Sequence, residues 1–282
     1  MLLRLEAWLT DATKALHEVA EQPRTEARRL VEFACGWDTV QQISEPDALL
    51  TREQFEVLSS LIARRLADEP LSRILGRREF WGLELDIRGA TLDPRADTET
   101  LVELVIETCG NPAPKTILDL GTGSGAILLA LLSELNSAHG LGIDQDSKTI
   151  ETARSNAQAL GLQDRARFVV GDWFSGVDAR FDLIASNPPY IPTPDLDHLD
   201  RNVRDYDDLR ALDGGADGLD FYRDTLKNAG RFLNEGGFLA LELGIGQTKA
   251  VIEIANAFGW TLRAQRNDLA GIPRALVFVA HP

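Results

Sequence analysis

From Asp97 to the C-terminus, short apolar stretches alternate with stretches whose apolar residues recur at helical spacing. Such alternation predicts strands joined by helical crossovers, which place the strands parallel in one sheet with helices on both faces. Strands are expected at residues 116–120, 141–144, 167–170, 181–186, 237–243 and 275–280. Helices are expected over residues 98–108 and 146–160. The predicted fold class is therefore α/β, with a mostly parallel, doubly wound sheet.

The first 70 residues have a different pattern, because their apolar side chains recur only at helical spacing. This pattern predicts a small helical bundle, with a capping box between Thr51 and Gln54 at the start of its third helix. The next segment, R-E-F-W-G-L-E-L-D-I, alternates and is aromatic, which predicts a strand or hairpin. We expect a helical domain over 1–70, a hairpin or linker over 71–93, and an α/β domain over 94–282.

Charge and composition exclude several classes of function. Lys plus Arg number 29 and Asp plus Glu number 44, giving a net charge of −15. Non-specific binding to nucleic acid or acidic membranes needs a positive field, so this balance argues against both. No apolar run approaches the roughly 18 residues of a membrane span, and the first 20 residues do not resemble a signal peptide.

Cysteine and histidine usage indicates neither a disulfide framework nor a metal site. Cys35 and Cys109 are isolated, and the four histidines are scattered without metal-ligand spacing. We expect two reduced thiols in a cytoplasmic protein, and no bound metal.

A glycine-rich turn follows the strand at 116–120, which continues into D-L-G-T-G-S-G-A. Gly121, Gly123 and Gly125 let the backbone turn tightly and approach a ligand, and the following helix presents free N–H groups. This turn also fits the dinucleotide fingerprint G-x-G-x-x-A, and a turn with no ligand is the simpler alternative.

Acidic residues follow the next two strands. Asp144 can accept hydrogen bonds from both hydroxyls of a ribose, which suits NAD and S-adenosylmethionine equally. Asp172 can accept from an adenine amino group, and Trp173 can lie against the ring or the ribose, although Trp173 is also a plausible core residue. All three positions follow carboxyl ends of strands, where open α/β sheets bind ligands.

The strand at 181–186 runs directly into Asn187-Pro188-Pro189-Tyr190. The prolines fix an extended turn and lack N–H groups, so the Asn187 side-chain oxygen and the Pro188 carbonyl are free to accept. A planar NH2 group can donate to both, while Tyr190 offers a flat face for stacking. These acceptors would favour a pyramidal nitrogen as positive charge develops, so the turn predicts transfer to a planar nitrogen. A proline-rich turn without chemistry is the alternative.

The glycine turn, Asp144 and N-P-P-Y together resemble class I S-adenosylmethionine-dependent methyltransferases that act on planar nitrogens. Nearly the whole chain is similar to the family that methylates the glutamine of the Gly-Gly-Gln loop in peptide-chain release factors. This resemblance is carried by R-E-F-W-G-L (78–83), D-P-R-A-D-T-E (93–99), N-P-P-Y-I (187–191), A-L-D-G-G-A-D-G-L-D-F-Y-R (211–223) and D-L-A-G-I-P-R (268–274). It implies a Rossmann-like methyltransferase domain, joined by a β-hairpin to a helical domain that recognises the substrate.

The resemblance also implies a set of site residues. Cofactor contacts are expected from Gly121, Thr122, Gly123, Ser124, Gly125, Asp144, Asp172, Trp173 and Asn187. Catalytic roles are expected for Asn187, Pro188 and Tyr190, with Pro189 joining them in substrate binding. Pro94, Arg95, Asp97, Thr98 and Glu99 would line the cofactor pocket or its lid. Ala96 stands where the family usually has proline, and Asp207-Asp208 stands where it usually has Glu-Pro.

Residues 195–224 contain ten Asp and four Arg in a long connection. Two interpretations fit: a solvated acidic loop, or a surface that steers a basic partner toward Tyr190. Either interpretation disfavours a DNA backbone beside the motif. We expect a monomer whose partner is a release factor, rather than DNA or a membrane.

Other functions share part of the pattern. Methylation of a ribosomal-protein glutamine uses the same motif, and adenine-N6 methylation uses the same hydrogen bonds for a flipped base. A cofactor-binding module without catalysis is a further alternative. NAD-dependent oxidoreduction lacks a His, Lys or Tyr-Lys constellation in this chain.

Overall fold

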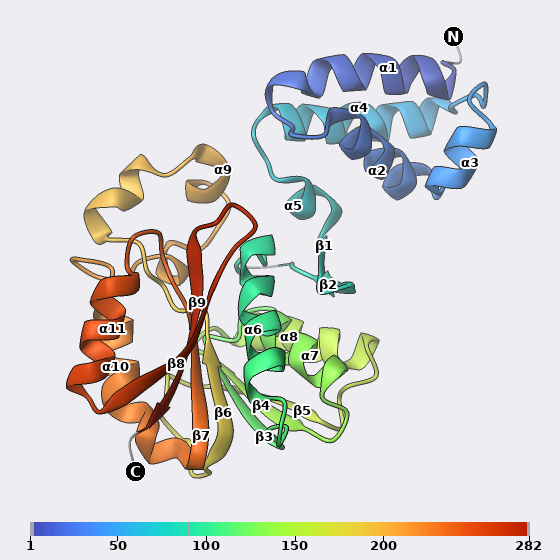
Figure 1. Cartoon of the computed structure of the whole chain (residues 1–282). Coiled ribbons are helices and arrows are strands. Elements are labelled where there is room, and N and C mark those ends of the chain that lie inside the picture. The colour runs from blue at the N-terminus through green and yellow to red at the C-terminus, as the bar shows by residue number, and fades with distance from the viewer. Residues whose placement is uncertain (1–2, 89–90, 281–282) are drawn as a thin grey trace. The chain divides into compact units, whose positions relative to one another are not determined.

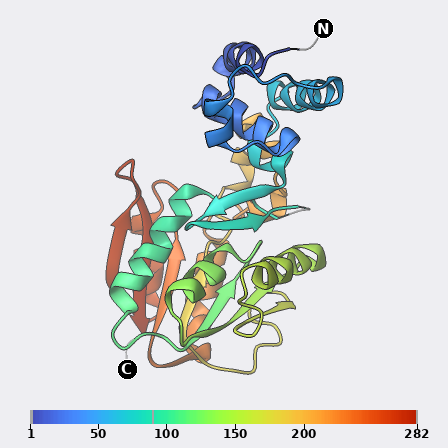
Figure 2. The same cartoon turned by 90° about the vertical axis from the view of Figure 1, so that its right-hand side faces the viewer.

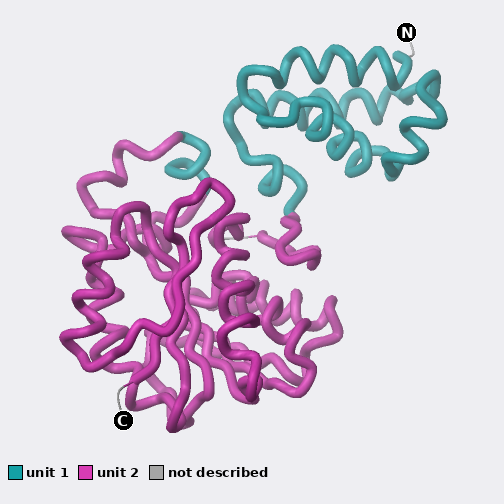
Figure 3. Tube along the Cα trace, viewed as in Figure 1, with its two compact units in different colours: residues 1–76, 201–206 teal, residues 77–200, 207–282 magenta. Residues whose placement is uncertain are grey.

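The computed structural model describes residues 3–88 and 91–280, and these form two compact units (Figures 1 and 3). Unit 1 comprises the residues up to 76 together with 201–206, and unit 2 comprises 77–200 and the residues from 207 onward. Each unit has its own apolar core.

Unit 1 is a helical bundle, as the apolar spacing predicts. Its helices are α1 (Leu5–Ala15), η1 (Leu16–Glu18), α2 (Pro23–Cys35), α3 (Thr39–Ser44), α4 (Arg52–Leu66), α5 (Leu71–Leu75) and α9 (Arg201–Arg204). The predicted capping box at the start of α4 is confirmed, because Thr51 and Gln54 each accept from the other's backbone N–H. Helix α3 was not predicted; the Asp38 side chain caps it by accepting from the N–H of Gln41.

Unit 2 begins with the antiparallel hairpin of β1 (Arg77–Phe80) and β2 (Leu83–Asp86), where the aromatic alternation predicts one. Its turn places Trp81 and Gly82 at positive φ, 54° and 70°, which suits the twist of a two-residue hairpin loop. The Trp81 backbone N–H donates to Glu99 and its indole N–H donates to Glu134, both at 2.8 Å. These two bonds attach the hairpin to helices of the α/β part.

Within the described residues of unit 2, seven strands form one sheet in the order β5-β4-β3-β6-β7-β9-β8. The strands are β3 (Thr116–Leu120), β4 (His139–Asp144), β5 (Ala166–Val170), β6 (Phe181–Ser186), β7 (Leu233–Glu242), β8 (Trp260–Asn267) and β9 (Pro273–Ala280). From β5 to β7 all neighbours are parallel, as predicted. The order reverses between β3 and β6, the switch point at which open α/β sheets bind ligands.

The edge of the sheet formed by β9 and β8 departs from the predicted parallel pattern. Strand β9 runs antiparallel to both β7 and β8, and β8 was not predicted as a strand. A parallel crossover needs about a dozen residues or more, and the loop between β8 and β9 is too short for one. The sequence of β8, W-T-L-R-A-Q-R-N, is polar at most positions, because every second side chain is exposed at this edge.

Helices cover both faces of the sheet (Figures 1 and 2). Helices α6 (Glu99–Cys109), α7 (Ala126–Glu134) and α8 (Ser147–Ala159) pack on one face, and α10 (Asp220–Asn228) and α11 (Thr248–Ala257) pack on the other. Parallel strands buried on both sides read as continuous apolar runs, which explains why β3 and β6 were visible in the sequence. Their carboxyl ends meet at one edge, where the glycine turn and N-P-P-Y emerge.

Candidate active site

The glycine-rich turn connects β3 to α7, and contacts with buried residues fix its conformation. Gly125 caps α7 at φ 85°, and a Cβ there would lie 3.1 Å from Leu129 and 3.2 Å from Phe168. The Thr122 hydroxyl donates to Asp119 at 2.6 Å. Complete burial raises the pKa of Asp119 to about 7, against the opposing effect of that hydrogen bond. Thr122 and Gly125 therefore shape the turn, while Gly121 and Gly123 line the cavity beside it.

A cavity opens above this turn and encloses about 740 Å³, part of it open to solvent. Its lining residues are Thr91, Leu92, Gly121, Gly123, Ile143, Asp144, Gln145, Asp146, Thr149, Gly171, Trp173, Asn187, Pro189, Asp208, Arg210 and Ala211. Six predicted site residues are among them, from four segments far apart in the sequence. The other predicted residues do not line the cavity: Thr122, Ser124, Gly125, Asp172, Pro188, Tyr190, Pro94, Arg95, Asp97, Thr98 and Glu99.

Asp144 ties the glycine turn to β4. One carboxylate oxygen accepts from the backbone N–H of Gly123 at 3.0 Å, and the other accepts from that of Asp146 at 3.1 Å. Burial raises the pKa of Asp144, and those backbone hydrogen bonds act in the opposite direction. Asp146 caps α8 by accepting from the N–H of Thr149 at 2.8 Å. Asp144 is thus fixed by the backbone on both oxygens while it lines the cavity.

Trp173 lines the cavity, whereas its neighbour Asp172 does not. Trp173 has a positive φ of 50°, rare for an aromatic residue, and its ring lines the cavity against Phe221 at 4.2 Å between centroids. Such strain persists where the surroundings hold the residue in place, and it clusters at ligand sites. Asp172 is exposed instead.

The Asn187-Pro188 turn leaves two oxygen atoms without partners among the described residues. The Asn187 side-chain NH2 donates to the Thr98 hydroxyl at 3.2 Å, so the amide nitrogen is engaged and its oxygen is not. The carbonyl oxygen of Pro188 accepts no hydrogen bond either, although the residue is buried. This is the acceptor pair that the sequence predicts for a planar NH2 group.

Tyr190 is held through its backbone by a residue that sequence reasoning missed. The Gln247 side chain donates to the carbonyl oxygens of Tyr190, at 2.8 Å, and Gly218, at 3.1 Å. Its own oxygen accepts from the N–H of Gly244 at 3.0 Å. Burial and the nearby Glu242 raise the pKa of Tyr190 to about 12, so the phenol stays neutral.

The D-G-G-A-D-G segment packs directly on the N-P-P-Y backbone. A Cβ at Gly214 would lie 2.8 Å from the Cα of Tyr190 and 2.9 Å from the carbonyl oxygen of Pro189. At Gly218 it would lie 2.4 Å from the carbonyl oxygen of Tyr190. Because backbone atoms cannot rotate away, any side chain at these positions must displace the motif. The segment therefore supports the motif and does not line the cavity.

Gly214→Ala is expected to lower turnover by about 10²-fold, because a displacement near 1 Å in a catalytic group has that effect. Steady-state kinetics with thermal melting measures it. Gly230→Ala is the matched control, since a Cβ there meets only Trp260, at 4.0 Å. Unchanged turnover in a folded Gly214→Ala protein would contradict this role.

The P-R-A-D-T-E segment lies beside the cavity, and Thr91 and Leu92, just before it, form part of the wall. Arg95 donates to Asp207 at 2.6 Å, an ion pair whose carboxylate is buried. Asp208 lines the cavity and accepts from Arg210. The Asp207-Asp208 pair, where the sequence departs from the family pattern, therefore holds one acid in an ion pair and places the other at the cavity.

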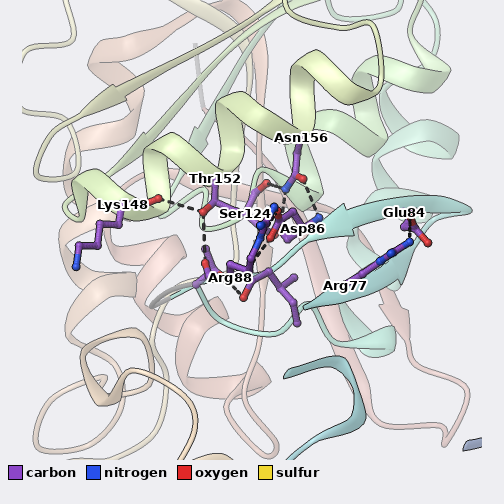
Figure 4. Close-up of polar contacts among 10 residues, drawn as sticks. Arg77, Glu84, Asp86, Arg88, Ser124, Lys148, Thr152 and Asn156 are labelled. Carbon is purple, nitrogen blue, oxygen red and sulfur yellow. Dashed lines mark hydrogen bonds and ion pairs between the residues drawn. The ribbon is translucent and has the colours of Figure 1, made fainter. Parts of the chain in front are cut away.

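A buried asparagine links the hairpin to the glycine turn (Figure 4). The Asn156 side chain accepts from the N–H of Asp86 at 2.8 Å, and donates to the carbonyl oxygens of Asp86 and Ser124, both at 2.9 Å. Thr152, one turn earlier on α8, donates to the carbonyl oxygen of Arg88. Helix α8 thus fixes the end of β2 against the backbone of the glycine turn.

The lining suits a ligand that has a sugar, a flat ring and positive charge. Asp144, Asp146 and Asp208 bring three carboxylates against the single guanidinium of Arg210, so phosphate groups are disfavoured. Trp173 and Ile143 supply apolar surface. S-adenosylmethionine, a sulfonium with an unphosphorylated ribose, fits this donor set better than NAD. In the described residues, no group of three or more His, Cys, Asp or Glu side chains is placed to hold a metal ion.

Comparison with known proteins identifies the family. Residues 7–76 match the model described as PrmC N-terminal domain, and residues 113–248 match the model described as Methyltransferase domain. The release factor glutamine methyltransferase of Rhodospirillum rubrum is 46% identical over 260 residues, covering 91% of this chain and 79% of that protein. The chain belongs to the release factor glutamine methyltransferase family. The protein of that name from Caulobacter vibrioides is 38% identical over 282 residues, covering 100% of this chain and 98% of its own.

Solved structures confirm the class I methyltransferase fold. A methyltransferase from Pyrococcus furiosus superposes with a TM-score of 0.53 at 20% identity, over 78% of this chain and 98% of that one. A ribosomal protein L11 methylase from Lactobacillus delbrueckii superposes with a TM-score of 0.51 at 20% identity, over 66% and 81%. The fold and the family expected from the sequence are both borne out. No helix within the described ranges is long and apolar enough to cross a membrane.

Proposed function

We propose that this enzyme transfers a methyl group from S-adenosylmethionine to the side-chain amide nitrogen of the glutamine in the Gly-Gly-Gln loop of peptide-chain release factors. The observation that carries the proposal is the pair of open acceptors, Asn187 Oδ1 and the Pro188 carbonyl, beside a cavity lined by Asp144 and Trp173. The family's curated members bear the name of this activity.

The cofactor is held by the glycine turn, Asp144 and Trp173 in this proposal. Asp144 accepts from the ribose hydroxyls, and Trp173 lies against the flat ring or the ribose. When bound, the cofactor supplies a methyl group on positively charged sulfur, which is already a strong electrophile. The cavity's carboxylates favour such a cation.

Asn187 and Pro188 act on the substrate nitrogen. An amide nitrogen is a poor nucleophile because its lone pair is delocalised into the carbonyl. Two acceptors that hold both N–H bonds out of conjugation keep the lone pair available, and they stabilise the positive charge that develops. Pro189 and Tyr190 confine the flat carboxamide. No general base is needed, since the nitrogen can lose its proton after transfer.

Unit 1 is proposed to recognise the release factor. Apolar side chains are exposed on α2 and α3, with Val40 75% and Ile43 62% accessible. Such side chains are suited to contact with a protein partner. We further propose that the chain acts as a cytoplasmic monomer on release factors and not on DNA, which its net charge of −15 and its free thiols support.

Mass spectrometry of a release factor after incubation with the enzyme and cofactor tests this function. We expect a mass gain of one methyl group on the Gly-Gly-Gln protein and none on a Gly-Gly-Ala variant. Methylation of a ribosomal-protein glutamine or of adenine in DNA, with the release factor left unmodified, would replace the proposal with one of those alternatives.

A further inference from the structure

Glu242, the last residue of β7, is completely buried and unused by the mechanism above. Neither of its carboxylate oxygens has a hydrogen-bond partner of ordinary geometry among the described residues. Burial raises the pKa of Glu242 to about 7. An unpaired buried carboxylate is costly to a fold, so its presence needs a reason.

Its surroundings leave the carboxylate without a dedicated cation. Arg274 of β9 lies near, but its guanidinium already pairs with Asp268 at 3.0 Å and with Asp97 at 3.2 Å. Charged and titratable groups from four elements act on Glu242. Arg274 lies on β9, Arg95 and Asp97 lie just before α6, Tyr190 lies in the N-P-P-Y turn, and Tyr222 lies on α10.

One neighbour of Glu242, Thr98, contacts the site. Its hydroxyl lies beside the Glu242 carboxylate and favours the charged form of that group. The same hydroxyl oxygen accepts from the side-chain NH2 of Asn187 at 3.2 Å. A hydroxyl has only one proton to donate. The bond with Asn187 uses the hydroxyl oxygen as acceptor and leaves the hydroxyl proton unused. Thr98 can therefore donate that proton to Glu242.

We propose that Glu242 and Thr98 are positioning residues that fix the direction of the Asn187 side-chain amide. A carboxylate only accepts, so Thr98 donates to it and Asn187 turns its NH2 group toward Thr98. The Asn187 oxygen is then left to face the substrate. The inference rests on the proposed function, because only an NH2 substrate requires that oxygen.

Protonation of Glu242 removes this constraint. A carboxylic acid can donate to Thr98, whose proton can then go to the Asn187 oxygen, turning the Asn187 NH2 toward the substrate NH2. Two donors would face each other and turnover would fall. Activity at saturating cofactor is therefore expected to rise with pH through about 7, as Glu242 ionises.

The first test compares Thr98→Val with Thr98→Ser in the release factor assay. The valine variant lacks the hydroxyl, and we expect its kcat to fall about 10- to 100-fold, by analogy with the loss of a hydrogen-bond partner that orients a metal ligand. The serine variant keeps the hydroxyl and is expected to retain most of the turnover. Equal losses in both variants, or none in the valine variant, would overturn the proposal.

The second test uses Glu242→Gln, which keeps the shape and removes the charge. We expect its kcat to lose the rise near pH 7 that the wild type shows. Asp119 also has a pKa of about 7, so the difference between the two profiles, rather than the wild-type profile alone, assigns the group. Because the raised pKa means that ionised Glu242 weakens the fold, the variant should melt no lower than wild type above pH 7. Identical pH profiles of kcat in wild type and Glu242→Gln would refute the proposal that Glu242 acts on Asn187 through Thr98.

A readout without substrate separates this inference from the proposed function. In protein labelled with ¹⁵N-asparagine, the Asn187 side-chain signal is identified by its loss in Asn187→Ser. We expect this signal to shift through about pH 7 in wild type and to stay constant in Glu242→Gln. If the shift occurs but no release factor is methylated, the positioning of Asn187 by Glu242 and Thr98 is supported and the proposed substrate is wrong. If methylation occurs without the shift, the positioning role of Glu242 and Thr98 is wrong.

Discussion

Asn187→Ala is expected to lower the turnover of release factor by about 10²- to 10³-fold, the usual effect of removing one group that stabilises developing charge. The substitution deletes the open Oδ1 acceptor and the bond to Thr98, while Asp144 and Trp173 remain to hold the cofactor. Cofactor affinity should therefore change far less than kcat. Steady-state kinetics at saturating cofactor, with calorimetric titration of the cofactor, measures both.

A matched control removes an asparagine elsewhere. Asn256 is exposed on α11, so Asn256→Ala makes the same chemical change outside the site and should leave kinetics and affinity unaltered. Equal losses of affinity and turnover in Asn187→Ala would mean that Asn187 mainly binds cofactor. The account of its acceptor role would then be wrong.

Asp144→Ala is expected to weaken cofactor binding by about 10²-fold or more, because two hydrogen bonds to a charged acceptor contribute roughly 1.5–3 kcal/mol each. The variant loses the proposed ribose acceptors and also the bond that holds the Gly123 N–H. Because both effects act on cofactor binding, the KM for cofactor should rise much more than kcat falls. Asp144→Asn keeps one acceptor oxygen and should be intermediate.

Asp178→Ala serves as the control for the loss of a carboxylate, since Asp178 is exposed and does not line the cavity. It should bind the cofactor like wild type. Cofactor affinity that is unchanged in Asp144→Ala would remove the ribose contact from the proposed site. A loss confined to kcat would move Asp144 from cofactor binding to the transfer itself.

Local patterns in the sequence encode part of the site. The glycine turn after β3 and the N-P-P-Y turn after β6 are each one short, unbroken stretch of sequence. Each follows a strand that the sequence shows as a run of mostly apolar residues. The rule that ligands bind beyond the carboxyl ends of strands then brought Gly121, Asp144 and Asn187 to one edge. The cavity contains all three.

Gln247 carries no such local signal, and Thr98 was expected near the cofactor pocket only because of the family resemblance. Thr98 is 89 positions from Asn187, and Gln247 is 57 positions from Tyr190. A threonine before a helix is an ordinary capping residue, and a glutamine after a glycine is an ordinary loop residue. Only their distant partners give them a role.

The amino-acid sequence by itself determined the α/β class, the parallel strands, the glycine turn and the acceptor-rich turn, because short-range spacing and backbone restriction encode each of these. The tertiary structure alone decided that β8 and β9 close the sheet antiparallel, that Gly214 packs under Tyr190, and that Glu242 is buried beside Thr98. These features depend on which distant side chains share a small volume. Burial and shared hydrogen bonds act through space, so the linear order of residues does not reveal them.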